Sequence, residues 1–116
     1  MSKFIEELKE IYDKKGVPYQ ELKKAKRAER VEYTAKNYYE QCLENIKLKV
    51  SIGELSFKVL GLRGIGSEDW DATDKVCERF RSEYSIRLER TVLWSKQPNL
   101  FNVDLTVDLR EKILSK

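Results

Sequence analysis

The sequence predicts an α+β fold in which an N-terminal helical hairpin packs with a β-α-β-β unit, as a single domain over residues 1–116. Apolar residues recur at helical spacing through the first half of the chain. Near the C-terminus they instead alternate with period two, and a glycine-rich segment with a third helical pattern lies between. We expect residues 1–50 to form the hairpin and residues 51–116 to form a small mixed or antiparallel sheet that ends in a β-hairpin.

The first helix begins after Ser2, a residue type that commonly caps helix N-termini. Its apolar side chains recur three and four positions apart and share one face: Phe4, Ile5, Leu8, Ile11 and Tyr12. Gly16 and Pro18 then supply a stop signal, because glycine ends helices and proline cannot continue one without loss of a hydrogen bond. We therefore expect the chain to turn there and the second helix to fold back on the first.

The second helical pattern is much longer and runs from Pro18 to about residue 47. Its apolar stripe contains Ala25, Ala28, Val31, Ala35, Tyr38, Tyr39, Cys42, Leu43 and Ile46. A continuous helix of this length spans about 42 Å, which exceeds the strands of a small sheet. We expect the first helix to cover part of the stripe and a second copy to cover the rest, as a homodimer. A break near residues 32–34 is the alternative.

Residues 54–62 are predicted to form the first strand, and Gly61, Gly64 and Gly66 to end it in a flexible loop. A helix then continues to about Tyr84. The last two strands lie over residues 86–94 and 101–109, joined by a short loop that contains a proline. Each has one polar face, so we expect helices to cover only one face of the sheet. The two strands that flank the helix allow a crossover if they are parallel neighbours.

The composition argues against catalysis and against a metal or cofactor site. The chain has no histidine, the most frequent general base, and its two cysteines, Cys42 and Cys77, are too far apart for a zinc knuckle. The acidic residues Glu68, Asp69, Asp71 and Asp74 are more typical of a helix N-terminus than of a magnesium site. The glycines of residues 61–66 match neither a dinucleotide fingerprint nor a P-loop. We expect a protein that is not an enzyme.

The sequence also predicts a cytoplasmic chain with no membrane partner. Its first ten residues carry several charges and lack the apolar stretch of a signal peptide. The longest unbroken apolar run covers only residues 59–62, with a glycine inside it, which is far too short to span a bilayer.

The charge is concentrated in one segment. The whole chain carries a net charge of +3, whereas residues 14–30 alone carry seven cations against two acids, and residues 51–116 are balanced. The cations of this segment are Lys14, Lys15, Lys23, Lys24, Lys26, Arg27 and Arg30. On a helical projection Lys23, Arg27 and Arg30 share a narrow arc, with Leu22 on the opposite, packing side. This cationic face predicts contacts with phosphates, and Gln20, Arg63 and Arg90 are additional candidates.

Simpler interpretations of the same residues remain open. A cationic helix face is often only solvated, and it can also dock to an acidic protein. The Gly16–Pro18 turn resembles the spacing of a helix-turn-helix unit, but Tyr12 and Lys15 stand where that unit usually has a small and an apolar residue. Alternation places Arg90 on an apolar strand face, where it lies at the margin or pairs at an interface.

We expect a small non-enzymatic nucleic-acid-binding protein that contacts phosphates through a basic helix face. The alternative is a protein-interaction module, such as an adaptor or a small inhibitor from a phage or mobile element, that binds a host protein.

Overall fold

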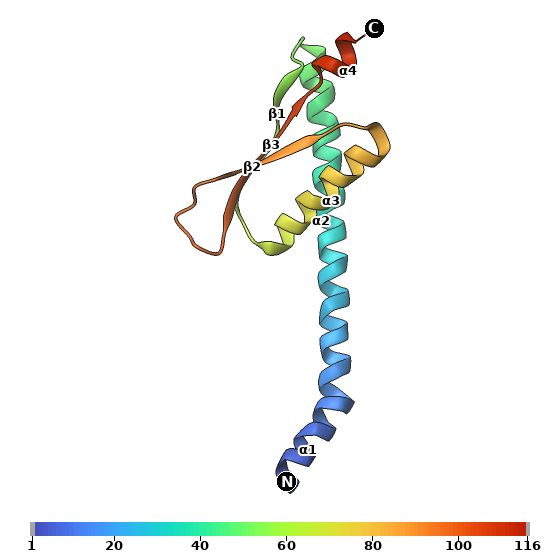
Figure 1. Cartoon of the computed structure of the whole chain (residues 1–116), viewed down its shortest axis with the longest axis vertical. Helices are drawn as coiled ribbons and strands as arrows, with labels where there is room; N and C mark the ends of the chain where they lie inside the picture. Colours follow the sequence, from blue (N-terminus) through green and yellow to red (C-terminus); the bar gives the residue numbers. More distant parts are fainter. Residues whose placement is uncertain (1, 116) are drawn as a thin grey trace. The chain divides into compact units, whose positions relative to one another are not determined.

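The computed structural model describes residues 2–115 and confirms the α+β class. Three helices, a three-stranded sheet, a π-helical turn and a short C-terminal helix follow one another along the chain (Figure 1). In order they are α1 (Lys3–Ile11), the π-helical turn η1 (Tyr12–Gly16), α2 (Val17–Ser51), β1 (Ser56–Ile65), α3 (Ser67–Tyr84), β2 (Leu88–Leu93), β3 (Phe101–Asp108) and α4 (Arg110–Leu114). Within residues 2–115, no helix combines the length and the apolar character needed to cross a membrane.

The chain divides into two compact units, residues 1–30 and 31–116. The boundary lies inside α2, whose 35 residues form one helix with no break near residues 32–34. The long second helix that the apolar stripe predicts is therefore present.

The predicted helical hairpin is wrong. Tyr12 and Val17 have right-handed helical backbone angles, and the Val17 N–H donates to the carbonyl oxygen of Tyr12, so the chain remains helical through η1. Gly16 is not among the glycines with positive φ, so it does not form a left-handed helix cap. Pro18 would clash with a carbonyl in a regular α-helix. The wider π turn that precedes it offers a way to accommodate the ring without a reversal of the chain.

The sheet is antiparallel, with strand order β1-β3-β2, and its last two strands pair as the period-two pattern predicts. Since β1 and β2 both run antiparallel to β3, they are parallel to each other but are not neighbours, because β3 lies between them (Figure 1). The connection through α3 therefore crosses over an inserted strand rather than joining adjacent strands.

Strand β1 is longer than predicted, because the glycines do not end it. The strand continues to Ile65, and its register with β3 shifts between Leu62 and Ile65. Gly64 lies in this irregular stretch with a φ of +62°, and its N–H donates to the side-chain oxygen of Asn102 at 2.9 Å. A residue without Cβ adopts this conformation at no steric cost. The predicted flexible loop is thus an ordered bulge in the strand.

The core of residues 31–116 lies between the helices and one face of the sheet. Phe80 of α3 and Leu105 of β3 are fully buried, and the Phe80 ring packs 4.9 Å from the ring of Tyr39 on α2. The other buried apolar residues are Val31, Ala35, Cys42, Val59, Ile65, Ala72, Val76, Leu88, Val103, Val107 and Leu109. On β3 the buried residues alternate with partly exposed polar ones, as expected for a sheet covered on one face.

Candidate nucleic-acid interface

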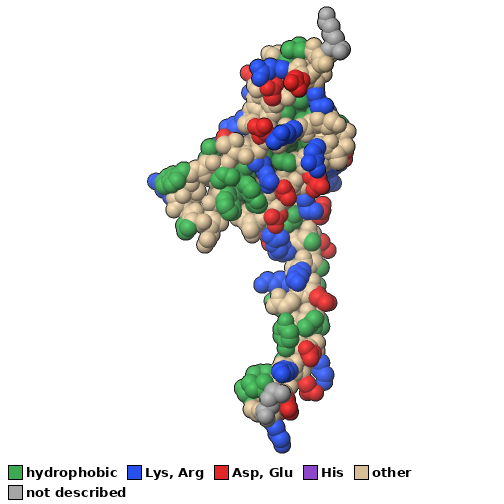
Figure 2. All heavy atoms as spheres, in the orientation of Figure 1, with side chains coloured by type: hydrophobic (Ala, Val, Ile, Leu, Met, Phe, Trp, Pro, Cys, Tyr) green, Lys and Arg blue, Asp and Glu red, His purple; other side chains and the backbone are tan. Residues whose placement is uncertain are grey.

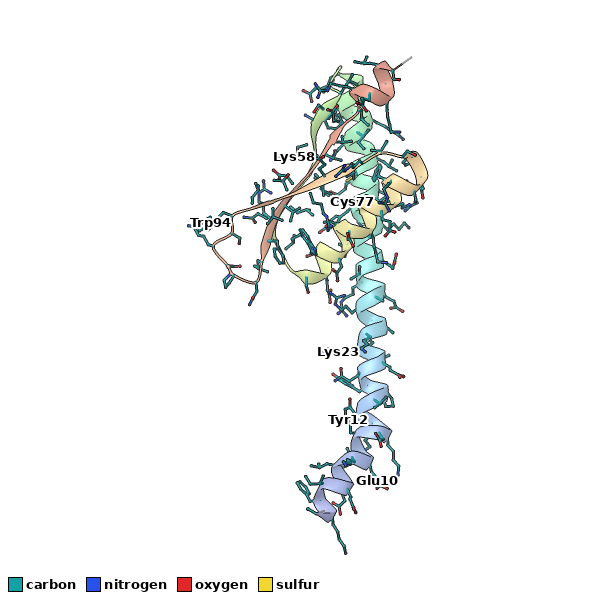
Figure 3. All side chains as sticks on the ribbon, in the orientation of Figure 1. Glu10, Tyr12, Lys23, Lys58, Cys77 and Trp94 are labelled. Atoms are coloured by element: carbon teal, nitrogen blue, oxygen red, sulfur yellow. The ribbon has the colours of Figure 1, made fainter. Side chains whose placement is uncertain are left out.

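The predicted cationic residues lie in η1 and in the first half of α2. Among the described residues 2–30, every side chain is exposed apart from Gly16 and Arg27, which are half-buried. The structure thus keeps Lys14, Lys15, Lys23, Lys24, Lys26 and Arg30 in solvent on one continuous stretch of helix, and Figure 3 labels Lys23 near its middle.

Five side chains of this stretch line a shallow hollow of about 120 Å³: Tyr19, Leu22, Lys23, Lys26 and Arg30. Their spacing of three and four residues places them on one face of α2. The hollow is far smaller than the ~300–1,000 Å³ of typical ligand pockets. A ligand of this face would therefore lie along the helix rather than inside a cavity. We refer to these five residues as the basic stripe.

The composition of the basic stripe corrects one prediction. Leu22 lies beside Lys23 and not on an opposite packing side, and it is 53% exposed. Arg27, which the projection groups with Lys23 and Arg30, does not line this hollow. Tyr19 is 64% exposed and lines the same hollow, although it is not among the residues predicted from the sequence. The spacing that places Tyr19 with Lys23 is present in the sequence, because the two residues are four positions apart. Tyr19 was overlooked because an expected hairpin partner would have covered it.

Among the described residues, the lysines of residues 14–30 form no ion pair, whereas six cations of residues 31–116 do. Within the part of the chain that the structure describes, no ion pair involves Lys14, Lys15, Lys23, Lys24 or Lys26, whereas Arg27 and Arg30 interact within the chain. In residues 31–116 several cations are paired: Lys49 with Glu54, Lys75 with Glu32, Arg79 with Glu83, and Arg110 with Asp108.

The counts of charged residues agree with this contrast. Residues 1–30 contain nine Lys and Arg against six Asp and Glu, whereas residues 31–116 contain 14 of each. On the face drawn in Figure 2, Lys and Arg side chains are interspersed with Asp and Glu over most of the molecule. All of the excess charge belongs to residues 1–30.

The three additional candidate residues also differ in whether they have anionic partners within the chain. Gln20 is exposed on α2. Arg63 donates to Asp104 at 3.0 Å. The guanidinium of Arg90 lies 4.4 Å from the centre of the Trp70 ring and donates to Asp74 at 2.9 Å. Arg63 and Arg90 thus have anionic partners within their own chain, and the partner of Arg90 comes from α3.

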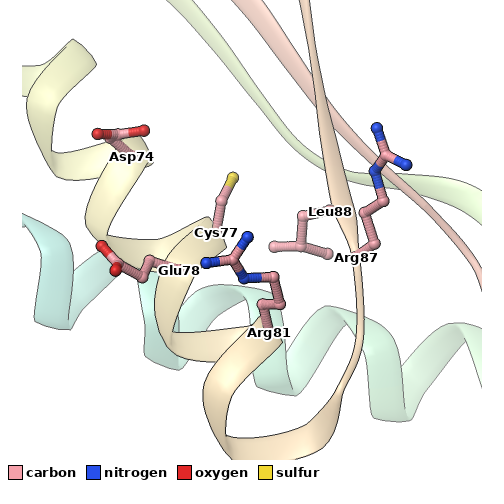
Figure 4. A pocket seen from close by; sticks show the side chains of 6 residues that line it. All are labelled: Asp74, Cys77, Glu78, Arg81, Arg87 and Leu88. Atoms are coloured by element: carbon pink, nitrogen blue, oxygen red, sulfur yellow. The ribbon is translucent and has the colours of Figure 1, made fainter.

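A second groove, of about 560 Å³, lies between α3 and the start of β2 (Figure 4). It is lined by Asp74, Cys77, Glu78, Arg81, Arg87 and Leu88. In this view the Arg81 side chain points towards Cys77 and Glu78, while Arg87 points away from them. Burial raises the pKa of the Cys77 thiol, which disfavours the nucleophilic thiolate. Acids and cations balance in this groove, so it has no strong preference for an anion.

The acidic residues at the start of α3 do not form a metal site within residues 2–115, where no group of three or more His, Cys, Asp or Glu side chains is placed to hold an ion. Glu68 and Asp69 lie in the first turn of α3, where negative charge stabilises the helix dipole. Comparison of the chain with profiles of known protein families, with curated proteins and with solved structures finds no match.

Proposed function

We propose that this chain is a non-enzymatic, cytoplasmic protein that binds nucleic acid through residues 14–30. The observation that carries the proposal is the concentration of exposed lysines without acidic partners on one helical segment, whereas the charges of residues 31–116 balance. Nucleic acids carry a dense row of phosphates, and cations that neutralise them release condensed counterions, which drives binding. Residues 14–30 carry a net charge of +5 over 17 residues, which is complementary to the negative charge of such a partner.

The basic stripe provides suitable spacing for these contacts. Lys23, Lys26 and Arg30 follow one another at intervals of about 4.5–6 Å along the helix axis. Successive phosphates of one strand can therefore be contacted from one face of α2. Lys26 and Arg30, four residues apart, repel each other by ~0.2–0.5 kcal/mol in a bare helix. A bound phosphate between them offsets this cost.

Tyr19 adds a contact that a purely electrostatic surface lacks. Its exposed ring lies in the same hollow as Leu22 and Lys23. Bases of single strands stack on exposed aromatic rings, with a contribution of ~1–3 kcal/mol per base. We expect single-stranded nucleic acid to bind more tightly than a duplex of the same length, because its bases are accessible to this ring.

The test is a charge reversal of the basic stripe. The double variant Lys23→Glu, Lys26→Glu removes two phosphate contacts and introduces repulsion. We expect affinity for a labelled single-stranded oligonucleotide, measured by fluorescence anisotropy, to fall at least about tenfold. The slope of log affinity against log salt is expected to decrease by about two, because each lysine contact contributes ~1.

The matched control reverses two exposed lysines elsewhere on α2, Lys36→Glu and Lys47→Glu, with the same change in net charge. We expect this control to retain most of the affinity and of the salt slope. Equal losses in both variants would show that only net charge matters, and unchanged binding in the basic-stripe variant would exclude the proposed site.

A second candidate function, a protein-interaction module, is favoured by the tip of the β2–β3 hairpin. Trp94 is 78% exposed and Val92 is 55% exposed. Figure 3 shows Trp94 on the segment that connects β2 and β3. Exposed aromatic residues of this kind are typical of contact sites for proteins. If this function holds, a protein partner is lost in the Trp94→Ser variant and retained in the Lys23→Glu, Lys26→Glu variant.

A further inference from the structure

Residues 3–22 expose an apolar surface that the described chain leaves uncovered. No residue of α1 is buried, and its apolar side chains include Phe4, 62% exposed, and Tyr12, 59% exposed. The seven large apolar side chains most exposed in this segment are Phe4, Ile5, Leu8, Ile11, Tyr12, Tyr19 and Leu22, which we name the N-terminal apolar face. Exposed apolar surfaces of this kind mark interaction sites in soluble proteins.

The N-terminal apolar face and the basic stripe share one side of the helix. When residues are placed about 100° apart in α-helix and about 80° apart in the wider π turn, Phe4, Ile11 and Tyr19 fall within a narrow arc. Lys23 and Arg30 fall close to the same arc. A partner that covers this side therefore meets apolar residues first and cations next along the helix.

The two parts of residues 1–30 carry opposite net charges, so two copies of this segment are complementary in charge when they run in opposite directions. Residues 1–13 carry two lysines and four acids, a net charge of −2, whereas residues 14–30 carry +5. Two copies in parallel would place the +5 segments against each other. Two copies in antiparallel orientation would instead place each acidic segment beside the basic segment of the other copy, which lowers the electrostatic energy of both.

We propose that two copies of this chain pair in antiparallel orientation through residues 3–30, with the N-terminal apolar faces in contact. In this arrangement Ile11 of one copy lies opposite Tyr19 of the partner copy, and Leu8 lies at the height of the partner's Leu22. The pairing is isologous, so every contact occurs twice. Lys15 lies near the two-fold axis, and its long aliphatic stem allows its ammonium group to reach solvent.

The size of the surface agrees with a dimer. Each of the seven side chains leaves on the order of 100 Å² in solvent, so two copies can bury on the order of 1,200 Å². Stable interfaces bury ~1,200–2,000 Å². A membrane surface fits less well, because helices that lie on anionic bilayers carry Lys and Arg on their polar face. The polar side of α1 instead carries Glu6, Glu7 and Glu10, which line a common hollow with Lys3.

The proposed dimer does not depend on the proposed nucleic-acid function, but it alters nucleic-acid binding. The acidic segment of the second copy covers part of the basic stripe, so nucleic acid and the second copy compete for Lys23 and Lys26. We therefore expect an excess of single-stranded oligonucleotide to shift the protein towards a monomer bound to nucleic acid.

The test is a charge swap, followed by sedimentation equilibrium of the full chain without nucleic acid. Glu7→Lys, Glu10→Lys makes α1 basic, and Lys23→Glu, Lys26→Glu makes the basic stripe acidic. We expect either variant alone to self-associate at least about tenfold more weakly than the wild type. An equimolar mixture should recover part of the association, because the introduced lysines of one variant then lie beside the introduced glutamates of the other, while the second half of the dimer keeps its native charges.

A matched control, Glu40→Lys, Glu44→Lys, reverses two exposed acids in residues 31–116 and should leave association unchanged. Leu8→Ser, Ile11→Ser tests the apolar contact without a change in charge and should also yield a monomer. No described residue of α1 is buried, so circular dichroism should show a folded sheet in every variant. A monomeric wild type at high concentration, or charge variants that associate like the wild type, would overturn the proposal.

The nucleic-acid measurement separates this proposal from the previous one. Glu7→Lys, Glu10→Lys should bind single-stranded nucleic acid at least as tightly as the wild type, because it keeps the basic stripe and weakens its competitor. Loss of self-association with retained oligonucleotide binding supports both proposals. Self-association without oligonucleotide binding retains the dimer and removes the nucleic-acid function.

Discussion

The charged residues of this chain differ chiefly in the partners available to them. Arg90 illustrates the paired kind, because its guanidinium lies over the Trp70 ring and contacts Asp74. Its place on an apolar strand face could be predicted from alternation, but its partner could not, since Asp74 comes from α3. Lys23 and Lys26 illustrate the other kind, for they have no acidic partner among the described residues.

The pair Asp108 and Arg110 provides a prediction at the scale of single residues. Asp108 accepts hydrogen bonds from the Arg110 guanidinium, at 2.6 Å, and from its backbone N–H, at 3.1 Å. These bonds lower the pKa of the Asp108 carboxyl to about 2. In the variant Arg110→Gln the guanidinium is lost, so we expect the pKa of Asp108 to rise part of the way to its ordinary value. A carboxyl NMR titration of Asp108 measures this shift.

The sign of the accompanying effect on stability follows from linkage. A carboxyl whose pKa is lowered by folding stabilises the folded state above its unfolded pKa of about 3.9. This contribution is lost as the pH falls from about 4 through about 2. We therefore expect the melting temperatures of wild type and Arg110→Gln to differ at pH 5 and to converge near pH 2. A difference that grows towards low pH would contradict the assignment.

At the scale of elements, the spacing of apolar residues correctly predicted the elements whose form depends on contacts along their own length. The period-two alternation over residues 101–109 correctly predicts β3, because one face of that strand packs on the core and the other does not. The hairpin at residues 16–18 failed for a physical reason: glycine and proline disfavour a regular α-helix, but they tolerate a π turn that loosens the hydrogen-bond ladder. Nothing in the apolar spacing distinguishes these two outcomes.

The bulge in β1 provides a prediction at this scale. Gly64 has a φ of +62°, which side-chain-bearing residues adopt only with steric strain. We expect Gly64→Ala to lower the free energy of unfolding by about 1 kcal/mol, as measured by urea denaturation. Gly61→Ala is the matched control, since Gly61 lies in the same strand without a positive φ and its new Cβ would meet neighbours at an ordinary 3.4 Å. Equal effects of the two substitutions would exclude a conformational cause.

At the scale of the whole molecule, the fold and the proposed contacts occupy different parts of the chain. Among residues 2–115, every buried apolar residue lies at or after Val31, whereas the net charge lies in residues 1–30. The charge of the site could be predicted by counting residues. Its apolar members, Tyr19 and Leu22, were not predicted, because the expected hairpin partner would have covered the side of the helix on which they lie.

The most direct test compares the full chain with a chain that begins at residue 28 and so lacks the cations from Lys14 to Arg27. Oligonucleotide affinity is measured for both across a range of salt concentrations. We predict that the shorter chain unfolds with a free energy within about 1 kcal/mol of the full chain, because none of the described residues that it lacks is buried. Its affinity and salt slope should nearly vanish. A folded shorter chain that binds with the affinity and slope of the full chain would contradict the assignment of nucleic-acid binding to residues 14–30.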